Sequence, residues 1–96
     1  LPNLQSLRRD FAFEVEAQVE AAQLVRAAKG ADKKLISEVR VFDAFEGGNL
    51  AEGAKSIALE VTLQPKDATL TDVDIEAVAE KITAAVEKAT GGKLRG

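Results

Sequence analysis

Strand-like alternation of hydrophobic and polar residues occurs in three stretches of the chain. Apolar residues alternate with polar or small ones over residues 11–16 and 55–63, which predicts two strands that each bury one face. Residues 35–45 alternate in the same way until Phe42 and Phe45 interrupt the pattern. A β-bulge near these two rings would re-aim the side chains at the end of this strand.

Helix-like periodicity occurs in two other stretches. Apolar residues repeat at helical spacing over residues 19–28, and Gly30 is the expected end of that helix. Residues 70–90 give the clearest helix, with Thr71 as N-cap and Asp74 as its capping-box partner. The predicted buried stripe of this second helix consists of Ile75, Val78, Ala79, Ile82, Val86 and Ala89.

The order of the predicted elements defines a fold class. Residues 93–95 are long enough for a short last strand, so the order is strand, helix, strand, strand, helix, strand. This order predicts an α+β ferredoxin-like split βαβ sandwich (βαββαβ), a four-stranded antiparallel sheet with two helices on one face. The other face is expected to stay open and to carry Ala12, Glu14, Ser56, Ala58 and Glu60.

The N-terminal end is expected to connect this domain to a longer chain. The length of 96 residues fits one domain, and the start at Leu1 rather than Met favours an excised or processed piece. Residues 1–7 contain one Pro and show no periodicity, so they are expected to be a linker. Arg8, Arg9 and Asp10 are expected just before the first strand, either as a turn with a local ion pair or with one Arg facing a phosphate.

Charge and missing residue types exclude several functions. The net charge is −3, from 13 basic and 16 acidic residues, and no basic stripe is present. RNA binding would therefore have to be local and shape-specific, or be supported by a larger protein. The chain has no His or Cys, so imidazole or thiol catalysis and soft-ligand metal sites are excluded. No apolar run approaches the roughly 18 residues of a membrane helix.

The best candidate for a site is the predicted hairpin of residues 39–63. It contains two of the four Phe residues, next to Asp43 and the pair Lys55 and Ser56. The glycine-rich loop between its strands is not a phosphate-binding loop, because the required Gly-Lys-Ser/Thr spacing and following helix are missing. An open sheet face with small central residues and aromatic residues at its rim can receive a flat ligand such as a base.

Several motifs in this order resemble those of a known family. They are Arg-Arg-Asp-Phe-Ala at 8–12, Val-Phe-Asp-Ala-Phe-Glu-Gly at 41–47, Gly-Ala-Lys-Ser-Ile-Ala at 53–58, Thr-Leu-Thr-Asp at 69–72 and Leu-Arg-Gly at 94–96. Together they resemble the ferredoxin-fold anticodon-binding domain, which is the C-terminal domain of the beta subunit of bacterial phenylalanyl-tRNA synthetases. The resemblance covers nearly all of residues 1–96.

The resemblance implies that the chain is a non-catalytic part of a cytoplasmic enzyme. The parent would be a phenylalanine–tRNA ligase, an α2β2 tetramer that uses ATP and Mg²⁺, with catalysis in its alpha subunit. The implied partners are the anticodon loop of phenylalanine tRNA and, through the rest of the parent chain, the alpha subunit. The resemblance implies neither a membrane partner nor a cofactor in this domain.

The resemblance also implies roles for individual residues. Asp43 and Phe45 map to the family positions that meet the first anticodon base, where Asp43 would accept hydrogen bonds from a guanine edge and Phe45 would stack. The family usually has Tyr in place of Phe45, so stacking is retained and a phenolic hydrogen bond is lost. Ala12 and Ser56 map to positions that frame the same pocket.

Three further residues complete the expected RNA-binding set: Arg9, Phe42 and Lys55. Which of Arg8 and Arg9 would contact the RNA backbone stays open. For Phe42 taken alone, an edge of the core is favoured over a ligand contact, because buried aromatic residues dominate cores. The alternative function is a free-standing ferredoxin-like module that binds a small ligand or a protein, in which Phe42 and Phe45 belong to the core or an interface. Composition favours this alternative, and the ordered motifs favour the RNA-binding module.

Overall fold

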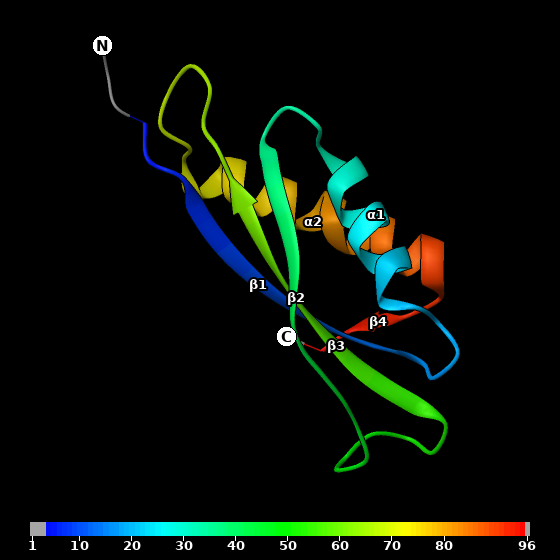
Figure 1. Ribbon diagram of the computed structural model, residues 1–96. Helices are drawn as coiled ribbons and strands as arrows, with labels where there is room; N and C mark the ends of the chain where they lie inside the picture. The colour runs from blue at the N-terminus through cyan, green and yellow to red at the C-terminus, as the bar shows by residue number, and fades with distance from the viewer. Residues whose placement is uncertain (1–3, 96) are drawn as a thin grey trace.

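A four-stranded antiparallel sheet and two helices make up the fold. The computed structural model describes residues 4–95. Its elements are β1 (Leu7–Glu16), α1 (Ala21–Ala31), β2 (Ile36–Glu46), β3 (Ala54–Leu63), α2 (Asp72–Thr90) and β4 (Lys93–Leu94), shown in Figure 1. The sheet order is β2-β3-β1-β4. The predicted βαββαβ sandwich is therefore confirmed.

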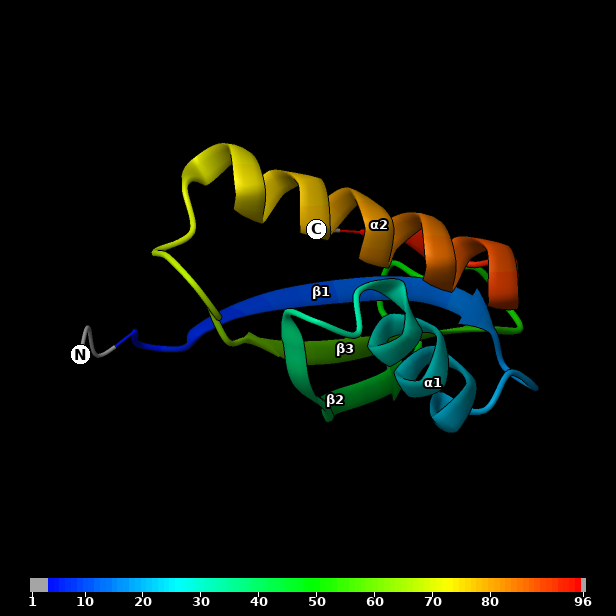
Figure 2. The ribbon, with the colours of Figure 1, turned by 90° about the horizontal axis from the view of Figure 1, so that it is seen from above.

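The core lies between the helices and one face of the two central strands, β1 and β3. Every second residue of these strands points into it, and Phe13, Leu59 and Val61 have no exposed surface. Both helices cover this same face, as Figure 2 shows from above. None of the described helices is long and apolar enough to cross a membrane. The alternation of apolar residues thus predicted the buried faces of β1 and β3 correctly.

The first strand begins earlier than the sequence predicted. Arg8, Arg9 and Asp10 are not a turn before β1, because each of them lies in the strand and pairs with β3. Their polar side chains give no strand signal of their own, and the length of β1 follows from that of its partner β3. Leu7, expected to be the last linker residue, is the first residue of β1, and residues 1–3 lie outside the described part.

The first helix also differs from the prediction. It begins at Ala21 and continues through Gly30 to Ala31, so Gly30 is not its end. Gly30 keeps a negative φ, whereas a glycine that stops a helix usually adopts a left-handed conformation. Asp32 forms the C-cap instead.

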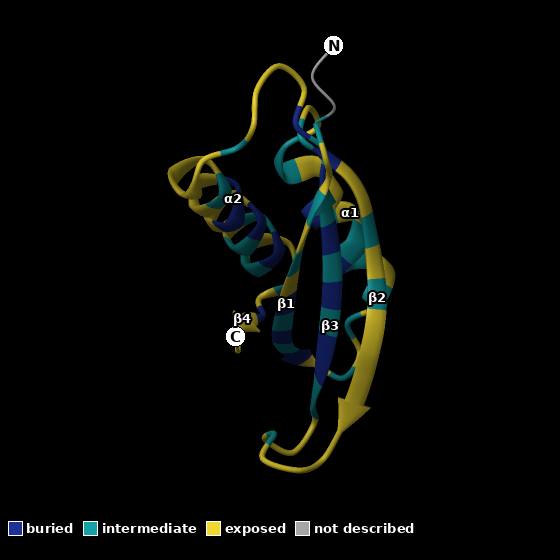
Figure 3. Cartoon of the chain, turned by 90° about the vertical axis from the view of Figure 1, so that its left-hand side faces the viewer, coloured by how far each residue is buried: buried dark blue, intermediate teal, exposed yellow. Residues whose placement is uncertain are grey.

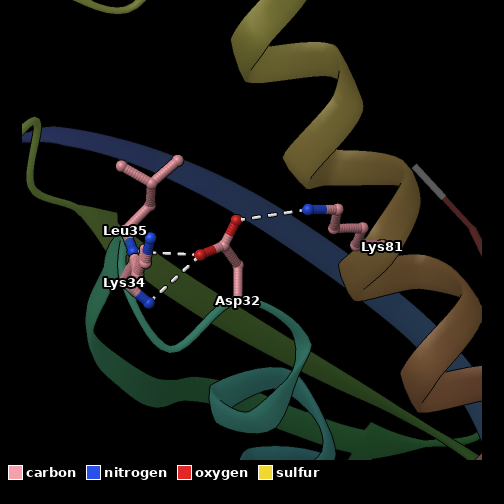
Figure 4. Close-up of polar contacts among 4 residues, drawn as sticks. All are labelled: Asp32, Lys34, Leu35 and Lys81. Carbon is pink, nitrogen blue, oxygen red and sulfur yellow. Dashed lines mark hydrogen bonds and ion pairs between the residues drawn. The ribbon is translucent and has the colours of Figure 1, made fainter. Parts of the chain in front are cut away.

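Asp32 also ties the α1–β2 turn to α2 (Figure 4). Its Oδ1 accepts hydrogen bonds from the backbone N–H groups of Lys34 and Leu35, both at 3.1 Å, and its Oδ2 lies 3.4 Å from Lys81 Nζ on α2. Burial by itself raises the pKa of this carboxyl, but the hydrogen bonds from Leu35 and Lys81 outweigh burial and hold the pKa below its ordinary value.

The start of α2 confirms the predicted capping box. Thr71 Oγ1 accepts from the N–H of Asp74 at 3.2 Å, and Asp74 Oδ2 accepts from the N–H of Thr71 at 2.9 Å. The second bond lowers the pKa of Asp74. The predicted buried stripe is correct except at its ends: Ile75 is only half-buried and Ala89 is exposed. Beyond Val86 the stripe continues to half-buried Thr90 and not to exposed Ala89. Residues four positions apart form one row along the surface of a helix, and Thr90 follows Val86 in that row.

The β2–β3 hairpin extends past both helices (Figure 3). The last five residues of β2, numbers 42–46, are all exposed, although the paired residues of β3 are mostly buried or half-buried. Within the sheet, this part of β2 pairs with β3 alone, and β1 lies on the far side of β3.

Candidate nucleic-acid interface

A β-bulge in β2 controls which side chains reach the open face of the sheet. Val41 pairs with Leu59, and Asp43 pairs with Ala58, the next residue of β3. Phe42 is thus an extra residue in β2 without a partner of its own in the register. The bulge lies where the sequence pattern becomes irregular, and an extra residue shifts the alternation of every later side chain.

The bulge moves the two candidate residues of β2 to the open face. In an unbroken strand, Asp43 and Phe45 would share the helix-facing side of Val41. After the bulge, Asp43 pairs with Ala58 and Phe45 pairs with Ser56, and both partners are open-face residues. Residues directly opposite each other in a sheet share a face, so Asp43 and Phe45 lie on the open side.

Four predicted site residues therefore lie together in two neighbouring rows across three strands. Ala12, Ala58 and Asp43 form one row, and Glu14, Ser56 and Phe45 form the next. Strand spacing and residue rise give this patch dimensions of about 10 Å by 7 Å, similar to those of a nucleobase. Small side chains occupy the middle, and the carboxylate and the ring lie on the edge strand β2.

Arg95 is a residue of this face that the sequence prediction missed. Its backbone N–H donates to the carbonyl oxygen of Ala12 at 2.6 Å, just beyond the end of β4. Its side chain then crosses the open face: Nη1 donates to Ser56 Oγ at 3.0 Å, and Cζ lies 5.7 Å from the centroid of the Phe45 ring. The only sequence signal for Arg95 was its place in the terminal Leu-Arg-Gly motif.

We call Ala12, Asp43, Phe45, Ser56 and Arg95 the open-face cluster. Within it, Ser56 is only 2% exposed although it lies on the open side, whereas Phe45 is 41% exposed. The cluster thus combines an accessible aromatic ring, a guanidinium next to that ring and a carboxylate one row away. Rings and guanidinium planes stack on flat ligands, and a carboxylate accepts hydrogen bonds from N–H groups.

Arg9 and Lys55 do not lie with the open-face cluster. Arg9 pairs with buried Val61, so it faces the helix side, where its guanidinium forms an ion pair with Glu76 of α2 at 3.2 Å. Lys55 pairs with buried Val15 and likewise faces away from the cluster. For these two residues the structure offers no shared surface with the rest of the predicted set.

Phe42 and Arg8 take intermediate positions. Phe42, the bulged residue, is 45% exposed and belongs to neither row. Arg8 pairs with Thr62 on the open face, two rows beyond Ala12, or about 13 Å along the strand. Of the two arginines that the sequence left undecided, Arg8 is therefore the one on the open side.

The open face is not a basic surface. Three arginines and Lys93 lie on it, but the acids outnumber these four basic groups, and Arg40 is already paired with Glu60 at 3.2 Å. The open-face acids, placed by the pairing register, are Asp10, Glu14, Glu16, Glu38, Asp43 and Glu60. Such a face does not attract phosphates in general, so it favours a ligand that is recognised through stacking and hydrogen bonds.

These features define a class of protein: an α+β sandwich whose open sheet displays groups able to stack on a flat ligand and to accept hydrogen bonds from its edge. The chain belongs to the ferredoxin-fold anticodon-binding domain family, whose sequence model matches residues 2–95.

Curated relatives support this assignment at high identity. The chain is 63% identical over 93 residues to a phenylalanine–tRNA ligase beta subunit from Paramagnetospirillum magneticum, with 97% of the chain covered. It is 62% identical over its whole length to the same subunit from Ruegeria pomeroyi, and 56% identical over 99% of its length to that from Bradyrhizobium diazoefficiens. The chain spans only about 12% of the length of each of these relatives.

Proposed function

We propose that this chain reads the anticodon of phenylalanine tRNA as a non-catalytic part of a phenylalanine–tRNA ligase beta subunit. The observation that carries the proposal is the bulge at Phe42, which brings Asp43 and Phe45 to the same open face as Ala12 and Ser56. Family membership and the names of the relatives support the same assignment.

The open-face cluster supplies three kinds of contact to a base. The Phe45 ring offers a stacking surface, and stacking on an aromatic ring contributes about 1–3 kcal/mol per base. Asp43 can accept hydrogen bonds from the N1–H and N2–H₂ groups of guanine, which no pyrimidine presents in that arrangement. Ala12 and Ala58 leave room for a base to lie close to the sheet, since neither side chain extends past Cβ.

The remaining functions belong to the parent enzyme in this proposal. ATP and Mg²⁺ would act in its catalytic subunit, which the beta subunit contacts through other parts of the parent chain. The acidic open face supplies few contacts to phosphates, so the isolated domain should bind RNA weakly. The rest of the cytoplasmic enzyme would supply the missing affinity by holding the tRNA in place.

A chemical-shift titration of this domain with the anticodon stem-loop of phenylalanine tRNA tests the proposal. The control is the same stem-loop with its first anticodon base changed. We expect shifts centred on Ala12, Asp43, Phe45 and Ser56 that are weaker with the control. If the isolated domain gives none, the same RNA is tested with the full enzyme. Absence of contact at these residues there too would refute the proposal and favour a module that binds another ligand.

A further inference from the structure

The short strand β4 is held from both sides. It pairs with β1 through only two residues, and the N–H of Arg95 extends the pairing by donating to Ala12. The N–H of Leu94 points the opposite way, because successive amides of a strand alternate in direction. That N–H donates to Oε2 of Glu87, on α2, at 3.0 Å.

The connection from α2 to β4 leaves β4 little freedom. Gly91 ends the helix in a left-handed conformation, with its N–H bonded to the carbonyl oxygen of Glu87 at 2.8 Å. Gly92 then passes so close to β1 that an added Cβ would lie 2.6 Å from Cγ1 of Val15. The chain therefore goes directly from the helix to the strand edge, and Glu87 holds both ends of this connection.

We propose that Glu87 is a positioning residue for Arg95. Its carboxylate fixes Leu94, and through the adjoining residue it sets the backbone from which the Arg95 side chain crosses to Ser56 and Phe45. Glu87 lies on the helix side of the sheet, so it affects the open face only through β4. The inference rests on the proposed function, because Arg95 is a member of the open-face cluster that is proposed to bind RNA.

Three variants isolate this role. Glu87→Ala removes the acceptor and keeps a residue that favours helix, so α2 should remain folded. Glu87→Gln keeps a side-chain oxygen that can accept from Leu94 and should preserve the wild-type arrangement. Glu80→Ala is the matched control, because Glu80 is an exposed acid on the same helix and forms no hydrogen bond with β4 among the described contacts.

The first measurement needs no RNA. In Glu87→Ala, hydrogen exchange at the amides of Leu94 and Arg95 should accelerate by about tenfold or more, because a hydrogen bond to a charged group is lost. Glu80→Ala should exchange at these amides as the wild type does, and Glu87→Gln, which keeps a neutral acceptor, should fall between the wild type and Glu87→Ala. Unchanged exchange in Glu87→Ala would overturn the positioning role, whatever the domain binds.

The second measurement links Glu87 to the site through a double-mutant cycle. Glu87→Ala should weaken binding of the anticodon stem-loop by roughly three- to tenfold when Arg95 is present, and should have no further effect in an Arg95→Ala background. Equal losses in both backgrounds would overturn the inference while leaving the proposed function intact. If no RNA binds to the wild-type domain or full enzyme, the proposed function fails, and the exchange measurement still decides whether Glu87 holds β4.

Discussion

Replacing Phe45 with Ala should separate the role of this ring in binding from its role in folding. Truncation of a fully buried Phe costs about 3–5 kcal/mol, so a ring that is 41% exposed should cost about 2 kcal/mol. This cost includes the loss of the contact between Phe45 and Arg95, because an exposed cation–π pair contributes only about 0.5–1 kcal/mol. The domain should therefore still unfold cooperatively, at a somewhat lower temperature.

The effect of Phe45→Ala on RNA binding should be larger than its effect on folding suggests. Loss of one stacked base removes about 1–3 kcal/mol, which corresponds to roughly 5- to 150-fold in affinity. Fluorescence anisotropy with a labelled anticodon stem-loop at fixed salt measures this change in the domain. In the full enzyme, charging of phenylalanine tRNA should fall correspondingly, mainly through a higher KM for tRNA.

Phe42→Ala is a closely matched control for Phe45→Ala. Phe42 lies on the same strand and is 45% exposed, so the two truncations remove nearly the same apolar surface. Because Phe42 is bulged and belongs to neither row of the cluster, its loss should lower stability similarly and leave RNA affinity almost unchanged. Equal losses of affinity would contradict the argument from the bulge and support the sequence prediction that included Phe42. Unchanged affinity and charging in Phe45→Ala would remove Phe45 from the site.

Three further predictions concern stability. Ile82→Asp places an unpaired charge at a position that is 1% exposed and should unfold the domain; a cooperative circular-dichroism melt at the wild-type temperature would contradict the assignment of the buried stripe. Gly92→Ala should destabilise by about 1–3 kcal/mol because its Cβ meets Val15, whereas Gly30→Ala, with no atom within 4 Å, should stabilise by up to about 1 kcal/mol; urea melts that rank the two alike would refute the packing at Gly92. The folded-state pKa of Asp32 lies below its ordinary value of 3.8, so its contribution to stability is present above that pH and is lost as the pH falls through the folded-state pKa. Urea melts between pH 7 and pH 2.5 should therefore show a smaller acid loss for Asp32→Asn than for the wild type, and parallel curves would show that Asp32 is not responsible.

The order of the elements and the buried faces could be predicted because their signals are local. Alternation with a period of two in β1 and β3, and helical spacing in α2, are properties of short stretches of sequence. The predicted start of β1 and the predicted end of α1 were wrong, because both boundaries depend on distant partners. Arg8 is in a strand because β3 reaches it, and the capping residue Asp32 is paired with Lys81, far along the chain.

The candidate site could be predicted only in part, for a similar reason. The family resemblance named Asp43 and Phe45, but the face on which they lie depends on the pairing register with β3, which no local pattern fixes. Arg95 was missed because its contacts with Ser56 and Phe45 require β4 to be placed on the opposite edge of the sheet from β2. A strand of two residues, such as β4, is too short to show a pattern from which this placement could be predicted.

The extra residue in β2 makes the number of residues in this strand part of its binding chemistry. Deleting one residue between Val41 and Asp43 would turn Asp43 and Phe45 toward the helices, even though every residue proposed to contact a base would still be present. Replacing Phe42 by another side chain keeps the count and therefore keeps both residues on the open face. Related chains should accordingly vary at this position by substitution and not by insertion or deletion. A designer who wishes to change the ligand preference of the proposed site should alter the paired rows and keep the length of the strand.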